Sequence, residues 1–153
     1  MGNIVSTKII ESESLQNISI NAFAYELLRE ELLPDLIGKE LDSILYWAGR
    51  NLARKYPLET IDEVIQFFTK AGWGDLTITE HKRREMHFKL TGALIEEREQ
   101  QKKHSSYQLE AGFIAEQIQK QRSVIAESYE EQKKRSSSVT FLVQWDVKDP
   151  MEV

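Results

Sequence analysis

The sequence predicts an α+β domain in which helices pack on one face of a twisted antiparallel sheet, in the order ααα-ββ-α-ββ. Two patterns of apolar residues predict it. Apolar residues recur at helical spacing from Ile20 to Phe68, and beyond Gly72 the spacing becomes that of strands. The 153 residues, 41% of them hydrophobic, suit one domain over 19–147 between a flexible arm, 1–18, and a tail, 148–153.

The net charge and the amino-acid usage exclude several classes of function. A formal charge of -5 argues against a general nucleic-acid binder, which needs a basic surface for phosphate. The chain contains no cysteine, so it has no disulfide and no thiolate nucleophile, and a cytoplasmic location is the expectation. No apolar run approaches the ~20 residues of a transmembrane helix.

The first predicted helix begins near Ile20. Its apolar stripe includes Phe23, Leu27 and Leu28, and Pro34 is expected to end it. Because the helix is short and follows an unanchored arm, we expect these three stripe residues to form the interface of a homodimer.

Two more helices follow with clear boundaries. The run 40–56 is amphipathic and ends before Pro57, and its small residues at 48–49 form a notch where a neighbouring backbone can approach. Thr60 and Glu63 form the capping box of the third helix, which Gly72 closes.

Alternating apolar residues predict two hairpins. In the first, a loop at 83–85 is expected to set Ile78 opposite Leu90, and the second joins 124–129 to 139–145. The hairpin tips, 82–84 and 133–135, are basic. They could meet at one end of the sheet and bind a phosphate or an acidic partner, or they could simply keep the turns soluble.

A fourth helix lies between the hairpins. The polar tract 96–104 is expected to form no element, and Ser105 with Gln108 is expected to cap the helix that follows. Small residues on this helix allow it to lie close against a sheet, or leave room for something else: Ala111, Gly112 and Ala115.

Several of these segments carry a family resemblance. They are Ile44–Arg54, Phe67-Phe68 with Gly72–Leu76, Tyr107–Ala115 and Val139–Val143. Together they resemble the 4-vinyl reductase domain and, more closely, the YslB family of Bacillus-type bacterial proteins. A more distant similarity is to core subunits of the transport protein particle (TRAPP), which tethers Golgi vesicles.

The resemblance covers about 20–146 and implies the ligand-binding fold of NO signalling and Golgi transport proteins. It also implies dimerisation and, from several relatives, a buried channel for an acyl chain or a small hydrocarbon. Many relatives carry zinc-binding cysteines near the last hairpin, but 127–141 has none here. A lipid attached to cysteine is excluded for the same reason.

No catalytic or metal-binding constellation stands out. His81, His87 and His104 have no ligand spacing, so neither a metal nor a cofactor is expected. The acidic residues come as adjacent pairs, and adjacent side chains on a helix or strand do not point at one substrate. An enzyme therefore ranks last among the possible functions.

Large apolar residues remain as the candidate site. The predicted ligand-binding pocket is lined by Trp47, Phe68, Trp73, Phe88, Phe113 and Ile114. Residues of this kind are also what an ordinary core contains. The expected function is accordingly a noncatalytic binding module for a hydrocarbon or acyl chain, and the alternative is a dimeric protein–protein adaptor with a filled core.

Overall fold

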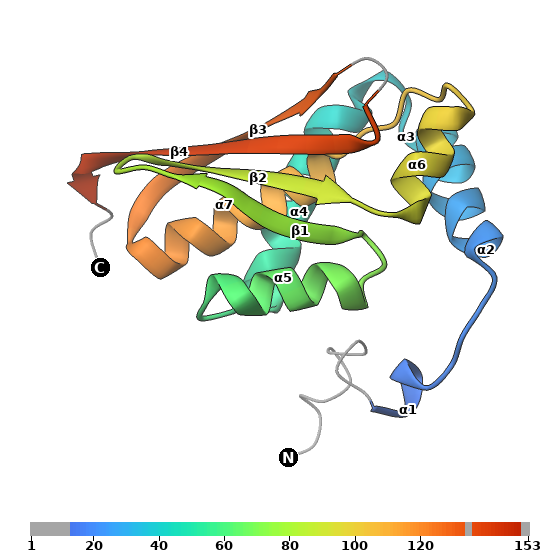
Figure 1. Cartoon of the computed structure of the whole chain (residues 1–153), viewed down its shortest axis with the longest axis horizontal. Helices are drawn as coiled ribbons and strands as arrows, with labels where there is room; N and C mark the ends of the chain where they lie inside the picture. Colours follow the sequence, from blue (N-terminus) through green and yellow to red (C-terminus); the bar gives the residue numbers. More distant parts are fainter. Residues whose placement is uncertain (1–12, 134–135, 151–153) are drawn as a thin grey trace. The chain divides into compact units, whose positions relative to one another are not determined.

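The computed structural model describes residues 13–133 and 136–150 (Figure 1). The chain divides between Leu41 and Asp42 into two compact units, and the domain predicted over 19–147 includes parts of both. Residues 148–150 of the predicted tail continue the last strand.

The first unit is helical. Its elements are α1 (Glu13–Gln16), α2 (Ala22–Glu26), the π-helical stretch η3 (Leu27–Leu32), α3 (Leu33–Ile37) and the 3-10 turn η4 (Gly38–Glu40). The side chain of Asn21 caps α2 by accepting a 2.9 Å hydrogen bond from the backbone N–H of Phe23.

Pro34 does not end this helix, contrary to the sequence prediction. Leu33 donates its N–H to the carbonyl of Leu28, which lies five residues earlier. The wider π-helical turn changes the local hydrogen-bond pattern, so the missing N–H of Pro34 is tolerated near the start of α3. The helix continues to Ile37 and ends at Gly38, where φ is +84°.

The second unit contains the remaining helices: α4 (Leu41–Lys55), α5 (Ile61–Lys70), α6 (Ala93–Gln100) and α7 (Gln108–Arg122). The predicted cap of α5 is confirmed, since Thr60 Oγ1 accepts a 3.2 Å hydrogen bond from the N–H of Glu63. The carboxylate of Glu63 accepts from the N–H of Glu59 instead of that of Thr60.

Two sequence expectations around α6 are wrong. The polar tract 96–104 begins inside a helix, because tertiary packing buries Ile95 and Arg98 on one side of α6 although the segment shows little apolar pattern. Ser105 does not cap α7: the hydroxyl of Ser106 accepts a 3.3 Å hydrogen bond from the N–H of Gln108, and the Ser105 carbonyl accepts from Gln132.

All strands form one antiparallel sheet. They are β1 (Asp75–His81), β2 (Glu85–Thr91), β3 (Val124–Gln132) and β4 (Ser138–Pro150), in the spatial order β1-β2-β4-β3. Both predicted hairpins are confirmed, but the register of the first is not. Ile78 pairs with Phe88 instead of Leu90, because the turn closes at 82–84 and a bulge lies between Ile78 and Glu80.

The two hairpin tips lie at opposite ends of the sheet. Glu85, next to the first turn, pairs with Gln144, whereas Ser138, next to the second turn, pairs with Thr91 at the far end of β2. The sheet therefore cannot bring the two basic tips together into one edge. The tip residues 134–135 lie outside the described part of the chain.

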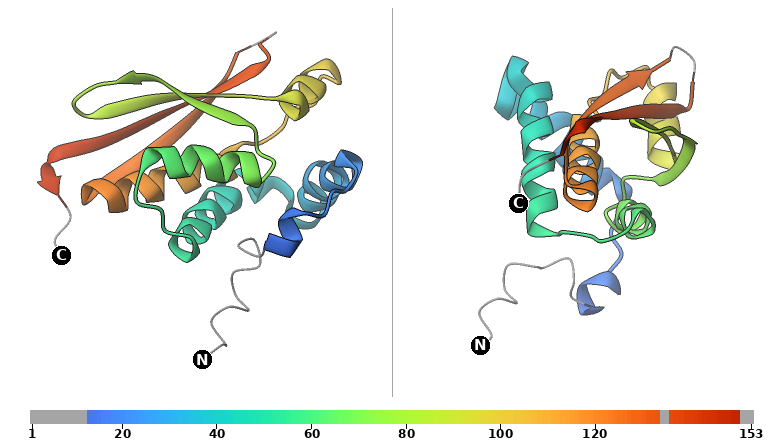
Figure 2. Two further views of the ribbon diagram at one scale, coloured as in Figure 1. Left: turned by 60° about the horizontal axis from the view of Figure 1, so that its bottom comes forward. Right: turned by 90° about the vertical axis from the view of Figure 1, so that its left-hand side faces the viewer.

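Helices α5 and α7 cover one face of this sheet (Figure 2). Alternate side chains of the central strands point into the core, among them Phe88 on β2 and its partner Phe141 on β4. Helix α7 is buried continuously from Glu110 to Ile118, because it lies between the sheet and the other helices. In the described residues, no helix has the length and apolarity needed to cross a membrane.

Candidate functional site

An aromatic cluster joins α5, the turn after it and α7. The rings of Phe67 and Phe113 stack with their centroids 4.5 Å apart, and Trp73 meets Phe113 edge to face at 5.3 Å. Phe68 completes the cluster, with its centroid 4.9 Å from that of Trp73. Such contacts add to the stability gained by burying the rings.

Trp73 connects this cluster to a surface hollow of about 220 Å³. The hollow is lined by Thr69, Gly72, Trp73, Gly74, Asp75, Gly92, Ala93 and Leu94. Trp73 remains 6% exposed while Phe68 and Phe113 are completely buried. Trp73 is therefore the residue of the cluster that also belongs to the lining of the hollow.

Glycine backbone forms part of the wall of this hollow, which we call the Trp73 hollow. Gly74 and Gly92 both have positive φ, at +136° and +154°, and a Cβ on Gly92 would lie 3.4 Å from the Cα of Gly74. A Cβ on Gly74 would lie 2.6 Å from the carbonyl oxygen of Thr91. The two segments approach closely because neither residue carries a side chain.

The structure brings some of the predicted pocket residues together and separates others. Phe68, Trp73 and Phe113 form the aromatic cluster, whereas Phe88 and Ile114 are buried in the core on β2 and α7. Trp47 lies elsewhere: it is 62% exposed on α4 and packs edge to face on Tyr46. Trp47 therefore does not line an enclosed pocket with the others.

Part of the small-residue surface of α7 serves helix packing. A Cβ on Gly112 would overlap the carbonyl oxygen of Tyr46, and one on Gly49 would lie 2.9 Å from the backbone nitrogen of Phe113. The notch predicted at 48–49 is thus used by α7. Gly112 leaves no room for a ligand, since the backbone of α4 fills it.

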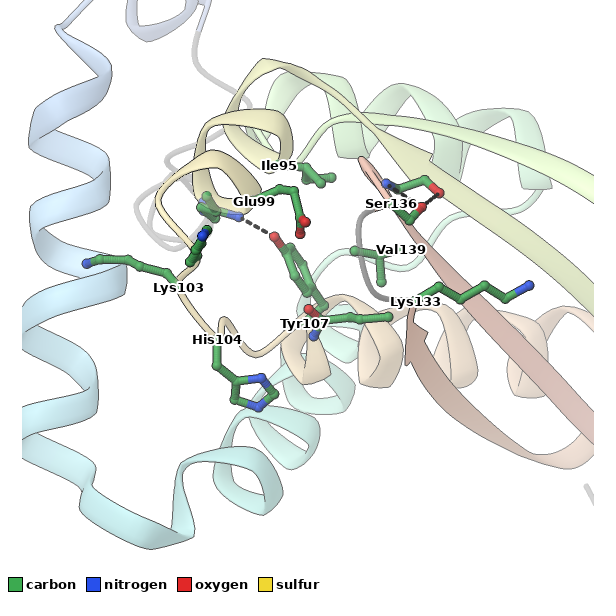
Figure 3. Close-up of a pocket in the computed structure, with 12 residues that line it drawn as sticks. Ile95, Glu99, Lys103, His104, Tyr107, Lys133, Ser136 and Val139 are labelled. Atoms are coloured by element: carbon green, nitrogen blue, oxygen red, sulfur yellow. Dashed lines mark hydrogen bonds between the residues drawn. The ribbon is translucent and has the colours of Figure 1, made fainter.

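A second hollow, of about 480 Å³, lies between α6, the loop after it and the second hairpin (Figure 3). Its lining residues are Ile95, Arg98, Glu99, Lys102, Lys103, His104, Tyr107, Gln132, Lys133, Ser136, Ser138 and Val139. Tyr107 projects into the middle of the view, and its hydroxyl accepts a 3.2 Å hydrogen bond from buried Arg98. We call this the basic hollow.

Glu130 lies beside the basic hollow and binds the start of α7. Its carboxylate accepts hydrogen bonds from the backbone N–H of Tyr107 at 3.1 Å and from the side chain of Gln108 at 2.7 Å. Burial raises the pKa of Glu130 above its ordinary value, and the nearby carboxylate of Glu110 adds to the rise.

The basic hollow is not predictable from the apolar pattern of the sequence, because α6 shows little of that pattern. Only the fold of α6 brings Arg98 and Ile95 to the same hollow as Val139 of β4. The available signal was weak: the tract after Gly92 contains good helix formers and lacks proline until well beyond α7.

Arg50 holds α4, α7 and β3 together. Its guanidinium donates to Glu116 at 2.9 Å and to the hydroxyl of Tyr46 at 3.2 Å, and it also donates to the backbone carbonyl of Ala126. Glu116 accepts a further bond from Arg54 at 3.0 Å. These hydrogen bonds compensate the burial of the positive charge of Arg50. We therefore interpret Arg50 as a structural residue.

His81 and His87 each pair with a polar side chain at the surface. His87 Nε2 lies 2.8 Å from the carboxylate of Glu85, and this bond lowers the pKa of the partly exposed Glu85 side chain. His81 Nε2 lies 2.8 Å from the guanidinium of Arg122. Within residues 13–133 and 136–150, no three histidine or acidic side chains gather as metal ligands would.

Residues 22–144 match the family described as "Protein of unknown function (DUF2507)". The chain belongs to the DUF2507 family. It is 51% identical over 139 residues to "Uncharacterized protein YslB" of Bacillus subtilis (strain 168), covering 91% of this chain and 94% of the Bacillus protein. The resemblance to the YslB family noted in the sequence is thereby confirmed.

Solved structures place this DUF2507 chain in the expected fold group. A vinyl-4-reductase family protein from Methanocaldococcus jannaschii aligns with a TM-score of 0.65 and 16% identity, over 95% of this chain and 98% of the other. An H-NOX protein from K. algicida aligns with a TM-score of 0.54 and 14% identity, over 95% and 87%. A trafficking protein particle complex subunit 3 from Naegleria fowleri aligns with a TM-score of 0.47 and 11% identity, over 86% of this chain and 92% of the other.

Proposed function

We propose that this chain is a noncatalytic binding module for an apolar small molecule, a hydrocarbon or an acyl chain, held where the Trp73 hollow meets the aromatic cluster. The observation that supports the proposal is the position of Trp73. Its ring contacts Phe67, Phe68 and Phe113, and the same residue is among those that line the hollow. An apolar chain that enters there replaces water with aromatic surface.

The ligand has to be small or has to extend into the cluster. The hollow of about 220 Å³ is below the usual size of a drug-sized ligand pocket. Each buried methylene contributes about 0.8 kcal/mol, so a chain of about ten carbons gains on the order of 8 kcal/mol. Association costs of about 4 kcal/mol or more leave about 4 kcal/mol at most, which corresponds to a dissociation constant of about 1 mM or weaker.

The known folds of this kind agree with a binding role without specifying the ligand. The H-NOX and vinyl-4-reductase family proteins align with this chain over 95% of its length in each case. Fold alone does not carry function. A cytoplasmic location, expected from the absence of cysteine, belongs to the same proposal.

Calorimetric titration with decanoic acid tests this function. We expect saturable binding to the wild type and its loss in Ala93→Phe, because a phenyl ring at this exposed position on the rim fills the hollow. Ala48→Phe is the matched control, since Ala48 is exposed on α4 and lies outside the hollow. Absence of binding in the wild type, or equal binding in Ala93→Phe, contradicts the proposal.

A dimeric adaptor is the second candidate, and a specific observation favours it. Helix 22–37 leaves a row of large apolar side chains exposed, namely Phe23, Leu27, Leu28, Leu32 and Leu36. Phe23 is 69% exposed and Leu27 50%. A contiguous apolar helix face is typical of a protein-binding surface.

A second copy of this chain is the partner that we propose for that face. Residues spaced along one helix meet their own equivalents across a two-fold axis, so a single stripe is enough to build an isologous contact. The predicted interface residues Phe23, Leu27 and Leu28 all belong to the exposed row. The exposed row belongs to the first unit and the Trp73 hollow to the second, so substitutions can test the two proposals separately.

A further inference from the structure

The basic hollow combines an apolar interior with a cationic rim. Ile95, Tyr107 and Val139 are at most 4% exposed and form its apolar surface. Figure 3 shows Ile95 and Glu99 on one side of Tyr107, and Val139, Ser136 and Lys133 on the other. Its volume of about 480 Å³ falls within the range of small-molecule sites.

Positive side chains gather at the basic hollow, although the chain as a whole is acidic. Arg98, Lys102, Lys103 and Lys133 line the hollow, and Glu99 is the only acidic residue among its lining residues. The formal charge of the chain is -5, so acidic composition alone would predict the opposite sign. A cleft lined by one sign of charge focuses the potential and raises the local concentration of anions.

These cations come from separate elements. Arg98 belongs to α6, Lys102 and Lys103 to the turn after it, and Lys133 follows β3. Lys102 adopts φ of +57°, which places the turn in the left-handed region and lets Lys103 donate its N–H to the carbonyl of Arg98. The helix end is thereby closed by backbone bonds.

Two linked hydroxyls complete the polar rim. Ser136 Oγ lies 2.9 Å from Ser138 Oγ and accepts a 3.2 Å hydrogen bond from the N–H of Ser138. The pair holds hydroxyl groups on the hairpin side of the hollow, across from α6. Hydroxyl and cationic donors on opposite walls suit an anion with several acceptor oxygens.

We infer that the basic hollow binds a small organic phosphate, a monoester whose dianionic head contacts the cationic rim and whose apolar part lies against Ile95, Tyr107 and Val139. A phosphate monoester carries close to two negative charges at neutral pH and presents three acceptor oxygens. A carboxylate carries one charge and two oxygens, so the same rim binds it less strongly. The site is distinct from the Trp73 hollow and does not rest on the function proposed for it.

Calorimetric titration with a matched set of probes tests the assignment. The probes are phenyl phosphate, inorganic phosphate, benzoate and benzyl alcohol. We expect phenyl phosphate to bind the wild type most tightly, inorganic phosphate and benzoate each to bind at least about tenfold more weakly, and benzyl alcohol not to bind; tenfold corresponds to about 1.4 kcal/mol. Binding of phenyl phosphate should weaken as salt is added.

Charge reversal locates the site. The double variant Lys102→Glu with Lys133→Glu changes two exposed residues of the rim and should weaken phenyl phosphate binding by more than about tenfold. The control Lys55→Glu with Lys120→Glu changes net charge equally at exposed positions of α4 and α7 outside the hollow. It should retain binding within about twofold.

Several outcomes would overturn the inference. They are no binding of phenyl phosphate to the folded wild type at millimolar concentration, binding of benzoate as tight as that of phenyl phosphate, and equal weakening in the two double variants. Circular dichroism of both double variants establishes that they are folded before the comparison is made. Decanoic acid binding is expected to be unchanged in the rim variant, which separates this site from the Trp73 hollow.

Discussion

Gly49 and Gly112 lie where α4 and α7 cross, and each faces the backbone of the opposite helix. A Cβ on Gly112 would lie 2.9 Å from the carbonyl carbon of Tyr46, and one on Gly49 would lie 3.0 Å from that of Leu109. The helices can approach this closely only because both positions lack a side chain. This contact places Arg50, one residue after Gly49, beside Glu116.

Gly112→Ala is expected to destabilise the protein by about 2–4 kcal/mol, although alanine has the better helix propensity. The added methyl meets backbone atoms of Tyr46, which cannot move without shifting α4. The measurement is equilibrium unfolding in urea. Ala48→Leu, an enlargement at an exposed position of α4, serves as control and should cost less than about 0.5 kcal/mol. A Gly112→Ala variant as stable as the wild type would mean that the helices are further apart.

Arg50→Met should cost about 3–5 kcal/mol, because it leaves the buried carboxylate of Glu116 without its closest cation. Arg54→Met removes the other cation that contacts Glu116, but the Arg54 side chain is 50% exposed. Solvent weakens that pair, so the expected loss is below about 1 kcal/mol. Urea unfolding of both variants gives the comparison, and equal losses would contradict the central role of Arg50.

Glu130→Gln should stabilise the protein increasingly as pH rises. Burial raises the pKa of Glu130 in the folded state, so the favourable contribution of the protonated carboxyl is present below the ordinary value of 4.5 and is lost as pH rises through the folded-state pKa. The amide in the variant does not ionise. Urea midpoints between pH 4 and pH 7 should therefore diverge in favour of Glu130→Gln.

Glu131→Gln is the control for loss of one negative charge, since Glu131 is an exposed neighbour on β3. A difference between Glu130→Gln and the wild type that stays constant with pH, or that shrinks as pH rises, would refute the assignment of a raised pKa to Glu130.

Leu27→Asp is expected to convert a dimer into a monomer, because it places a charge in the exposed apolar row of helix 22–37. Sedimentation velocity at micromolar concentration measures the change. Ile125→Asp makes a similar substitution at a residue on β3 that is 59% exposed, and it should leave the dimer intact. A monomeric wild type, or a Leu27→Asp dimer, would show that this row does not form the interface.

Local signals in the sequence were sufficient for much of the fold. Thr60 and Glu63 marked the start of α5, and the change of period after Gly72 marked the hairpins, because capping and alternation depend on near neighbours. The prediction that the first helix ends at Pro34 is wrong, because a π-helical stretch, which has no simple sequence signature, accommodates this proline. The register at Ile78 was missed because one bulged residue shifts the pairing.

The candidate sites depend on contacts between distant segments, which a single sequence shows poorly. The grouping of Phe68, Trp73 and Phe113 could be predicted, since all are large apolar residues on facing elements. The exposure of Trp47 could not, because it lies beside the buried stripe of α4 and only packing decides which side is covered. Arg98 became a site residue only through the position of α6.

Nuclear magnetic resonance of the tryptophan indoles during titration with decanoic acid tests the central claim most directly. Trp73 lines the hollow, whereas Trp47 is exposed on α4. The indole N–H signal of Trp73 therefore reports on the site, and that of Trp47 serves as an internal control. We expect the Trp73 signal to shift and saturate in the millimolar range while the Trp47 signal stays in place. A Trp73 signal that does not move in the folded protein, or a shift confined to Trp47, would contradict ligand binding at the aromatic cluster.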